Sequence, residues 1–97
     1  MRPSILGVGL RALDDREKSQ LGRKGGIAVV AVTEGSPAAA AHIQAGDIIV
    51  AIDGHAIVDL AGTPALLASV AGRTVSIDLV RAGAPVSVTA RLNPAVP

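Results

Sequence analysis

The last quarter of the chain has the plainest hydrophobic pattern. Between residues 73 and 81 apolar and polar side chains alternate, so that Val75, Ile77 and Leu79 share one face of an extended strand. Ala82-Gly83 supplies a turn, and a second such run covers residues 85–92. Two extended runs joined by a short glycine-containing turn predict a terminal β-hairpin.

The middle of the chain predicts buried central structure. Residues 27–32 are rich in β-branched side chains, which favour a strand. Residues 48–52 form a continuous apolar run, as in a strand that is covered on both faces, and Asp53-Gly54 then forms a tight-turn pair. A brief extended piece follows from residue 55, and its Leu60 is expected to plug the core beneath the next helix.

Two short apolar helices are predicted from their starting residues. Ser36-Pro37 and Thr63-Pro64 each place a hydroxyl group, which can cap free amides, before a proline. An alanine run extends the first helix, which is over by Gly46. The second helix, Thr63–Val70, has a stripe made by residues 63, 66, 67 and 70.

A charged segment near the start predicts a third, solvated helix. Residues 14–21 begin with acidic residues, and Leu13 and Leu21 are expected to anchor the two ends. A glycine-rich loop with Arg23 and Lys24 follows. These two cations could attract a peptide, but we prefer the interpretation that they keep the loop soluble.

The order of signals in residues 35–54 resembles the core signature of PDZ domains. A Gly-Ser-Pro-Ala start, a short helix, a Gly-Asp step and a strand ending in Asp-Gly recur together in that family, and the resemblance is greatest to the bacterial HtrA/Deg-family serine proteases. It implies an α+β, mainly β fold: a partly open β-barrel of five or six strands with two short helices, in the bacterial, permuted strand order. We expect one domain over residues 1–97, with a core at about 4–92 and a tail or linker at 93–97.

Residues 5–10 alternate apolar side chains with glycines, which allows close approach of two backbones. From the residues alone, a buried first strand with a glycine bulge is the favoured interpretation. The resemblance reverses this preference, because Ile5, Leu6, Gly7 and Val8 match the family's carboxylate-binding loop. It implies that the amides of Leu6, Gly7 and Val8 hold a terminal carboxylate, a role that suits consecutive N–H groups in a tight loop.

The same resemblance implies a peptide groove between a strand at Val8–Ala12 and the helix at Thr63–Val70. A C-terminal peptide would add there as an antiparallel strand. Leu66 is left mainly to the core. The expected groove residues besides the loop are Gly9, Leu10, Thr63, Leu67 and Val70.

Composition excludes several other classes of function. The 97 residues include no aromatic side chain, so no platform exists for stacking bases, sugars or flavins. Nine Lys and Arg against eight Asp and Glu leave a net charge of +1, far from a nucleic-acid-binding excess. No apolar run approaches the ~20 residues that span a bilayer, so we expect no direct membrane insertion and no targeting signal in this chain.

Catalysis, metal and cofactor binding are not expected in this chain. Serine, histidine and aspartate occur, but their spacing offers no nucleophile arrangement. His42 and His55 without a third nearby ligand make a poor zinc site, and the chain has no cysteine. We therefore expect no cofactor.

The resemblance implies that this module recognises hydrophobic C-terminal or unfolded peptides and regulates a separate trypsin-like catalytic domain in a periplasmic or secreted quality-control protease. The abrupt start at Met1 suggests a piece of a larger protein. Two alternatives stay open. The module could belong to another parent, such as a site-2 protease, a C-terminal processing protease or a secretion component, or it could be a structural or assembly module with an unused groove.

Overall fold

The computed structural model describes residues 5–21 and 25–94. The predictions for Met1, for the Arg23-Lys24 loop and for residues 95–97 lie outside this part, as does the side chain of Leu21. Six strands and three short helices are described: β1 (Val8–Ala12), α1 (Asp15–Leu21), β2 (Ile27–Val32), α2 (Pro37–Ala40), β3 (Ile48–Ile52), β4 (His55–Ala56), α3 (Thr63–Val70), β5 (Thr74–Arg81) and β6 (Ala84–Arg91).

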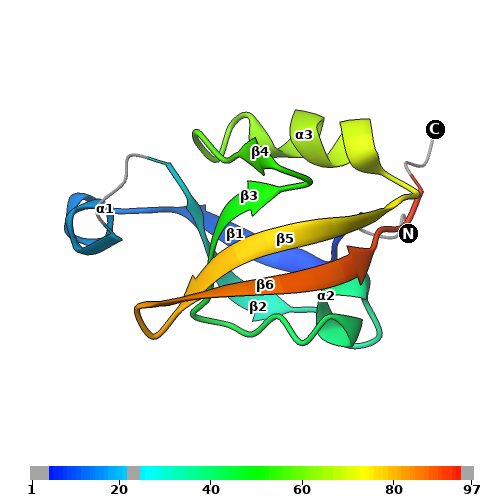
Figure 1. Ribbon diagram of the computed structural model, residues 1–97, viewed down its shortest axis with the longest axis horizontal. Helices are drawn as coiled ribbons and strands as arrows, with labels where there is room; N and C mark the ends of the chain where they lie inside the picture. Colours follow the sequence, from blue (N-terminus) through cyan, green and yellow to red (C-terminus); the bar gives the residue numbers. More distant parts are fainter. Residues whose placement is uncertain (1–4, 22–24, 95–97) are drawn as a thin grey trace.

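The strands form one open antiparallel sheet in the order β1-β2-β3-β5-β6, with β4 paired to β3. Figure 1 shows α3 above β4, α2 at the other side of the sheet near the end of β6, and α1 set apart at one end. The predicted α+β, mainly β architecture is confirmed, with α1 as a further short helix beside the two apolar ones. β1 is an edge strand, because the described residues give it only β2 as a partner.

The hydrophobic core is entirely aliphatic. Its centre comes from the strands, and Val75, Ile77 and Leu79 of β5 are all at most 2% exposed, as their alternation predicts. Ala38 and Ile43 bring the α2 segment onto the same core. Since packed cores need shape complementarity rather than aromatic rings, branched side chains and alanine suffice here.

Asn93, at which the tail or linker was expected to begin, forms two backbone hydrogen bonds. Its N–H donates to the carbonyl of Ile5 over 3.1 Å, and its carbonyl accepts from the N–H of Gly72 over 3.1 Å. These bonds join the first and last described segments, so the two ends of the described chain are held side by side.

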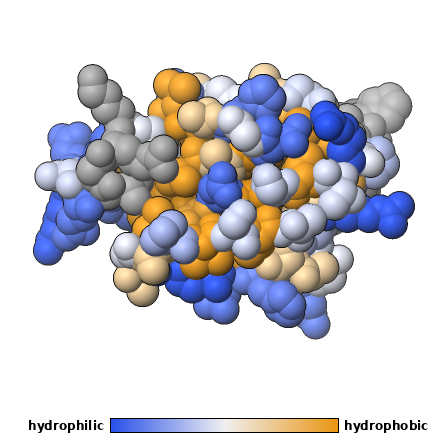
Figure 2. All heavy atoms as spheres, in the orientation of Figure 1, coloured by the Kyte–Doolittle hydropathy of each residue, from blue (hydrophilic) through white to orange (hydrophobic). Residues whose placement is uncertain are grey.

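α1 is capped by acidic residues, as predicted. The Asp14 carboxylate accepts from the Glu17 N–H over 2.7 Å, and the Glu17 carboxylate accepts from the Asp14 N–H over 3.1 Å, which is a capping box. Arg11 of β1 donates to Glu17 over 2.7 Å, and this bond, followed by the bond with Asp14, lowers the pKa of Glu17 to about 2. Hydrophilic residues gather at the end of the molecule where α1 lies (Figure 2).

An ion pair between the buried Asp47 and the half-buried Arg81 fixes the connection between α2 and β3. The Asp47 carboxylate, whose side chain is 3% exposed, accepts two bonds from Arg81 over 2.9 and 2.7 Å and one from the Gln44 N–H over 2.9 Å. Arg81 also donates to the carbonyl of His42 over 2.9 Å. One guanidinium from β5 therefore holds both ends of the turn that follows α2.

Burial raises the pKa of Asp47, but the bonds from Arg81 and Gln44 outweigh it, so the pKa lies below the ordinary aspartate value. The stabilisation is therefore complete above the unfolded pKa, about 3.9, and is lost as the pH falls through the lower folded pKa. We expect Asp47→Asn to lower the free energy of unfolding at pH 7 by about 1.5–3 kcal/mol in urea denaturation.

The gap in unfolding free energy between parent and Asp47→Asn should narrow from pH 6 to pH 2. The exposed Asp78 offers a matched control, since Asp78→Asn should change stability by less than about 0.5 kcal/mol at pH 7. A gap that stays constant over this pH range would show that the ionised carboxylate is not what stabilises the pair.

The β5–β6 turn contains a residue in an unfavourable backbone conformation. Arg81 pairs with Ala84, so Ala82 and Gly83 form a two-residue turn with φ of 52° and 80°. Turns of this kind prefer Asn-Gly, because asparagine tolerates a positive φ better than alanine. We expect Ala82→Asn to raise the free energy of unfolding by about 0.5–1 kcal/mol in urea denaturation, whereas Ala84→Asn within β6 should give no gain. A gain of equal size from both variants would contradict the turn argument.

Candidate functional site

The candidate site is a cavity of about 220 Å³ between the start of β1 and α3, which we call the groove cavity. Nine residues line it: Ile5, Leu6, Gly7, Val8, Leu10, Leu60, Thr63, Pro64 and Leu67. The structure thus brings seven of the nine predicted site residues together. None of the nine lining residues carries a charged side chain, so any charge on a ligand would be met by backbone dipoles.

Residues 5–7 are held by their carbonyl groups. The Ile5 carbonyl accepts from the Asn93 N–H over 3.1 Å, the Leu6 carbonyl from the Ala38 N–H over 3.0 Å, and the Gly7 carbonyl from the Thr33 N–H over 2.8 Å. Because a trans peptide unit points its C=O and N–H in opposite directions, these bonds turn three amides away from the partners.

The three amides are those of Leu6, Gly7 and Val8. Among the described residues, the N–H groups of Leu6 and Gly7 donate to no acceptor. Val8 pairs with Val32, and the adjacent bond from Thr33 to Gly7 marks this as a pair whose N–H and C=O point away from β2. Three consecutive donors therefore face the open edge of β1.

Gly7 makes this arrangement possible. Its φ of 85° interrupts the alternation of an extended strand, so that consecutive carbonyls can point the same way. A Cβ at Gly7 would lie 2.2 Å from the Cβ of Ser36, which leaves no room for any side chain. Ser36 caps α2, as predicted, by accepting from the Ala39 N–H over 3.2 Å.

The far wall of the groove cavity comes from α3 and the segment before it. Asp59 prepares the helix start, because its carboxylate accepts from the Gly62 N–H over 2.8 Å and its carbonyl accepts from the Thr63 hydroxyl over 2.9 Å. Thr63 is 1% exposed. Its one hydroxyl proton is therefore used inside the protein, and its oxygen can still accept a bond.

Two predicted groove residues do not line the cavity. Val70 is a core residue, only 2% exposed. At about 100° per residue, Val70 lies between Leu66 and Leu67 around the helix, so it points straight down onto the sheet. Gly9 lies in β1 next to a register shift, and a Cβ there would face Val30 of β2 at 3.2 Å.

Sequence reasoning missed two wall residues and simplified a third. Leu60 is half-buried and lines the groove cavity as well as packing on the core, and the exposed ring of Pro64 lines it too. Leu66 also packs against the core, but it lines a different cavity on the other side of α3. Both Leu60 and Pro64 lie within three residues of Thr63 in the sequence, and this nearness to the apolar stripe of the helix could have indicated that they line the groove.

Other functional sites gain no support from the geometry. Within residues 5–21 and 25–94, no three histidine, aspartate or glutamate side chains gather where they could hold a metal ion. His42 and His55 are both exposed. In the same part of the chain, every helix falls short of the length and apolar character needed to cross a membrane.

Comparison with known proteins places the sequence in a family. Residues 4–92 match the PDZ domain family. A curated relative, the magnetosome formation protease MamE of Magnetospirillum gryphiswaldense, is 35% identical over 85 residues, which are 84% of this chain and 11% of MamE. The chain therefore spans about a tenth of the length of that relative.

Solved structures agree with this match. The HtrA-type protease AlgW with a decapeptide has a TM-score of 0.79 and 32% identity, covering 95% of this chain and 29% of AlgW. The HtrA3 PDZ domain bound to a phage-derived ligand has a TM-score of 0.75, covering 91% of this chain and 83% of that one, and at 22% identity it supports the fold alone. The chain belongs to the PDZ domain family, and the relatives with which it shares this domain are proteases.

Proposed function

We propose that this domain binds the free C-terminus of an extended peptide with an apolar last residue, and that it does so for an HtrA-type serine protease. The observation that carries the proposal is the set of amides of Leu6, Gly7 and Val8 at one end of the groove cavity. Consecutive donors without internal acceptors suit a carboxylate, and bonds to a charged acceptor are the stronger kind. The domain itself is non-catalytic.

The rest of the peptide would use the edge of β1. Val8 points its N–H and C=O away from β2, so a peptide strand can extend the sheet there. Its last side chain would enter the apolar space between Val8, Leu10 and Leu67. Support also comes from AlgW, whose solved structures hold a decapeptide and a tripeptide.

The protease role is proposed from the relatives. MamE and AlgW are proteases, and this chain matches 11% and 29% of their respective lengths, so the rest of each relative lies outside the match. We infer that a catalytic domain elsewhere in the parent protein acts on chains that this domain captures, or is regulated by their capture. Joining this domain to the parent's protease segment and finding no effect of C-terminal peptides on cleavage would count against this role.

The carboxylate test separates this mechanism from adhesion to an apolar patch. A short peptide with an apolar free C-terminus should bind with a Kd on the order of micromolar in calorimetry. Its C-terminal amide should bind at least about tenfold more weakly, which is ~1.4 kcal/mol, because the charged acceptor is gone. Raising the salt concentration should matter less than amidation, since the donors are local. Equal binding of acid and amide across several peptides would refute the carboxylate loop.

The groove wall offers a matched pair of substitutions on α3. Leu67→Glu should abolish binding of the same peptide, because it places a charge in the apolar space. Ala68→Glu, at the adjacent exposed position, should leave the affinity within about twofold. Both variants should keep the circular dichroism of the parent, whereas Val75→Glu in the core should unfold. Parent-like binding by folded Leu67→Glu would show that the groove is assigned to the wrong place.

A further inference from the structure

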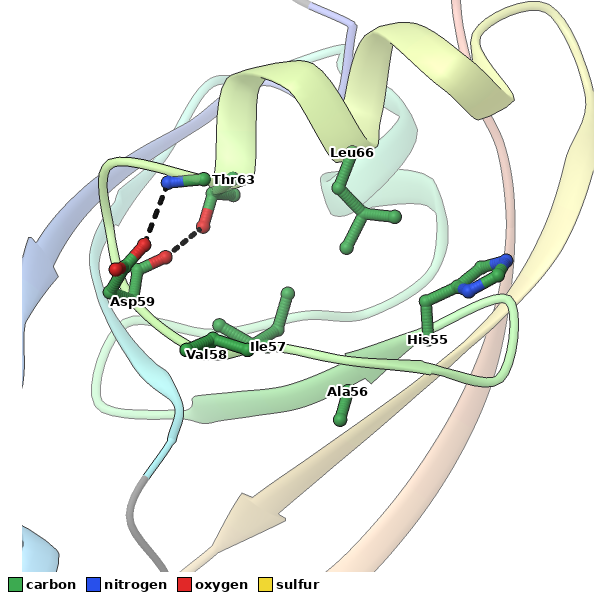
Figure 3. Close-up of a pocket in the computed structure, with 8 residues that line it drawn as sticks. His55, Ala56, Ile57, Val58, Asp59, Thr63 and Leu66 are labelled. Atoms are coloured by element: carbon green, nitrogen blue, oxygen red, sulfur yellow. Dashed lines mark hydrogen bonds between the residues drawn. The ribbon is translucent and has the colours of Figure 1, made fainter.

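A second cavity of about 180 Å³ lies on the other side of α3, and we call it the back cavity. Residues 55–59 form its floor, and Gly62, Thr63 and Leu66 line it from α3 and the turn before it. Figure 3 shows Ile57 and Leu66 pointing toward each other across the space, while the Ala56 side chain points away. Thr63 lines both cavities, so the groove cavity and the back cavity share one helical wall.

Ile57 and Leu66 make the centre of the back cavity aliphatic, while His55 and Asp59 stand at its two ends (Figure 3). Ile57 is 3% exposed and Leu66 is half-buried, while the neighbouring Val58 is 78% exposed, the most exposed large apolar side chain in the described part of the chain. Burial of apolar surface favours association in proportion to the area removed from water. An aliphatic side chain inserted there would lose its own exposed surface and cover that of Leu66, while Ile57, already buried, forms the base of the space.

The backbone beside the back cavity can also pair with a partner. Ile52 pairs with His55 across the turn, Ala51 pairs with Ala56, and the Ile57 N–H donates to the Val50 carbonyl over 2.9 Å. Pairs alternate between bonded and non-bonded in an antiparallel ladder, so the N–H and C=O of Ala56 point away from β3. Within residues 5–21 and 25–94 neither group has a backbone partner, although Gly25 lies against the carbonyl of the next residue, Ile57.

The negative charge of Asp59 determines which kind of partner segment the back cavity favours. Asp59 stands at one end of the back cavity (Figure 3), and one of its carboxylate oxygens accepts from Gly62. In the described ranges Asp59 forms no salt bridge, and His55, at the other end, is the only other titratable side chain among the residues that line the back cavity. A cation beside the inserted side chain would therefore complement the Asp59 end.

We propose that the back cavity is a second docking site, which takes one aliphatic side chain of an extended partner segment that carries lysine or arginine next to it. The segment would pair with Ala56, insert its aliphatic side chain between Ile57 and Leu66, and place a cation near Asp59. This site needs no free C-terminus, so it is independent of the groove cavity.

The test uses three tripeptides that are acetylated and methylamidated, so that none offers a terminal carboxylate. Lys-Leu-Lys should shift the Ala56 amide and the Ile57 and Leu66 methyl signals in NMR titration, with a Kd in the millimolar range as befits a small ligand. Lys-Gly-Lys should bind at least about tenfold more weakly, because it has no side chain to insert. Glu-Leu-Glu should bind at least about threefold more weakly at low salt.

Two variants sharpen the assignment. Leu66→Phe fills the space and should remove the saturable response to Lys-Leu-Lys. Asp59→Asn keeps an oxygen for Gly62 and should abolish the preference for Lys-Leu-Lys over Glu-Leu-Glu. If a variant does not fold, the NMR titration of the unaltered domain with the three tripeptides still decides the proposal. Saturable shifts confined to Leu10 and Leu67, equal binding of Lys-Gly-Lys, or no saturable shift at Ala56 would each overturn the proposal.

Discussion

The amides of the candidate site are oriented by three hydrogen bonds whose donors lie outside the site. They run from Thr33, Ala38 and Asn93 to the carbonyls of residues 5–7, and each donor belongs to a different part of the chain. In a planar trans peptide unit the N–H points opposite to the C=O. A hydrogen bond that fixes the direction of a carbonyl therefore also fixes the direction of the next residue's N–H. The geometry of the loop is thus a consequence of how β2, α2 and the end of β6 pack around it.

Several features remote from the groove serve this anchoring. Ser36 caps α2 and also occupies the space beside Gly7, so the helix start and the loop are mutually fitted. Asp47 and Arg81 hold the turn after α2, which keeps the helix in place against the sheet. Ser36 and the Asp47–Arg81 ion pair therefore act on the candidate site through the backbone, without touching a ligand.

Much of the fold could be predicted from local patterns. The bounds of β2 match the expected range, because a β-branched run favours a strand locally. The bounds of β1 and α3 match as well, but the range of β1 came from the resemblance to PDZ domains. At the start of α3 the Thr63 hydroxyl donates to the Asp59 carbonyl and caps no free amide, so only the proline part of the expected start is present. The pairing of Asp47 with Arg81 could not be predicted in this way, since 34 residues separate the two in sequence and only the β3–β5 pairing brings them together. The backbone bonds of Asn93 could not be predicted for the same reason, because its partners lie at the other end of the chain and beyond the last helix.

The stripe on α3 shows where periodicity stops being informative. Thr63 and Val70 lie at the centre of the stripe and are buried, while Leu66 and Leu67 lie about 60° and 40° to either side and face different cavities. The pattern identified all four as one apolar face, but only the positions of β1 and β4 on the two sides of the helix decide which leucine faces which cavity. Because neither leucine is fully buried, α3 is anchored near its two ends and presents half-buried apolar surface on both flanks. A ligand on either flank would therefore contact the same helix, which is why the roles of Leu66 and Leu67 have to be separated by substitution rather than by sequence pattern.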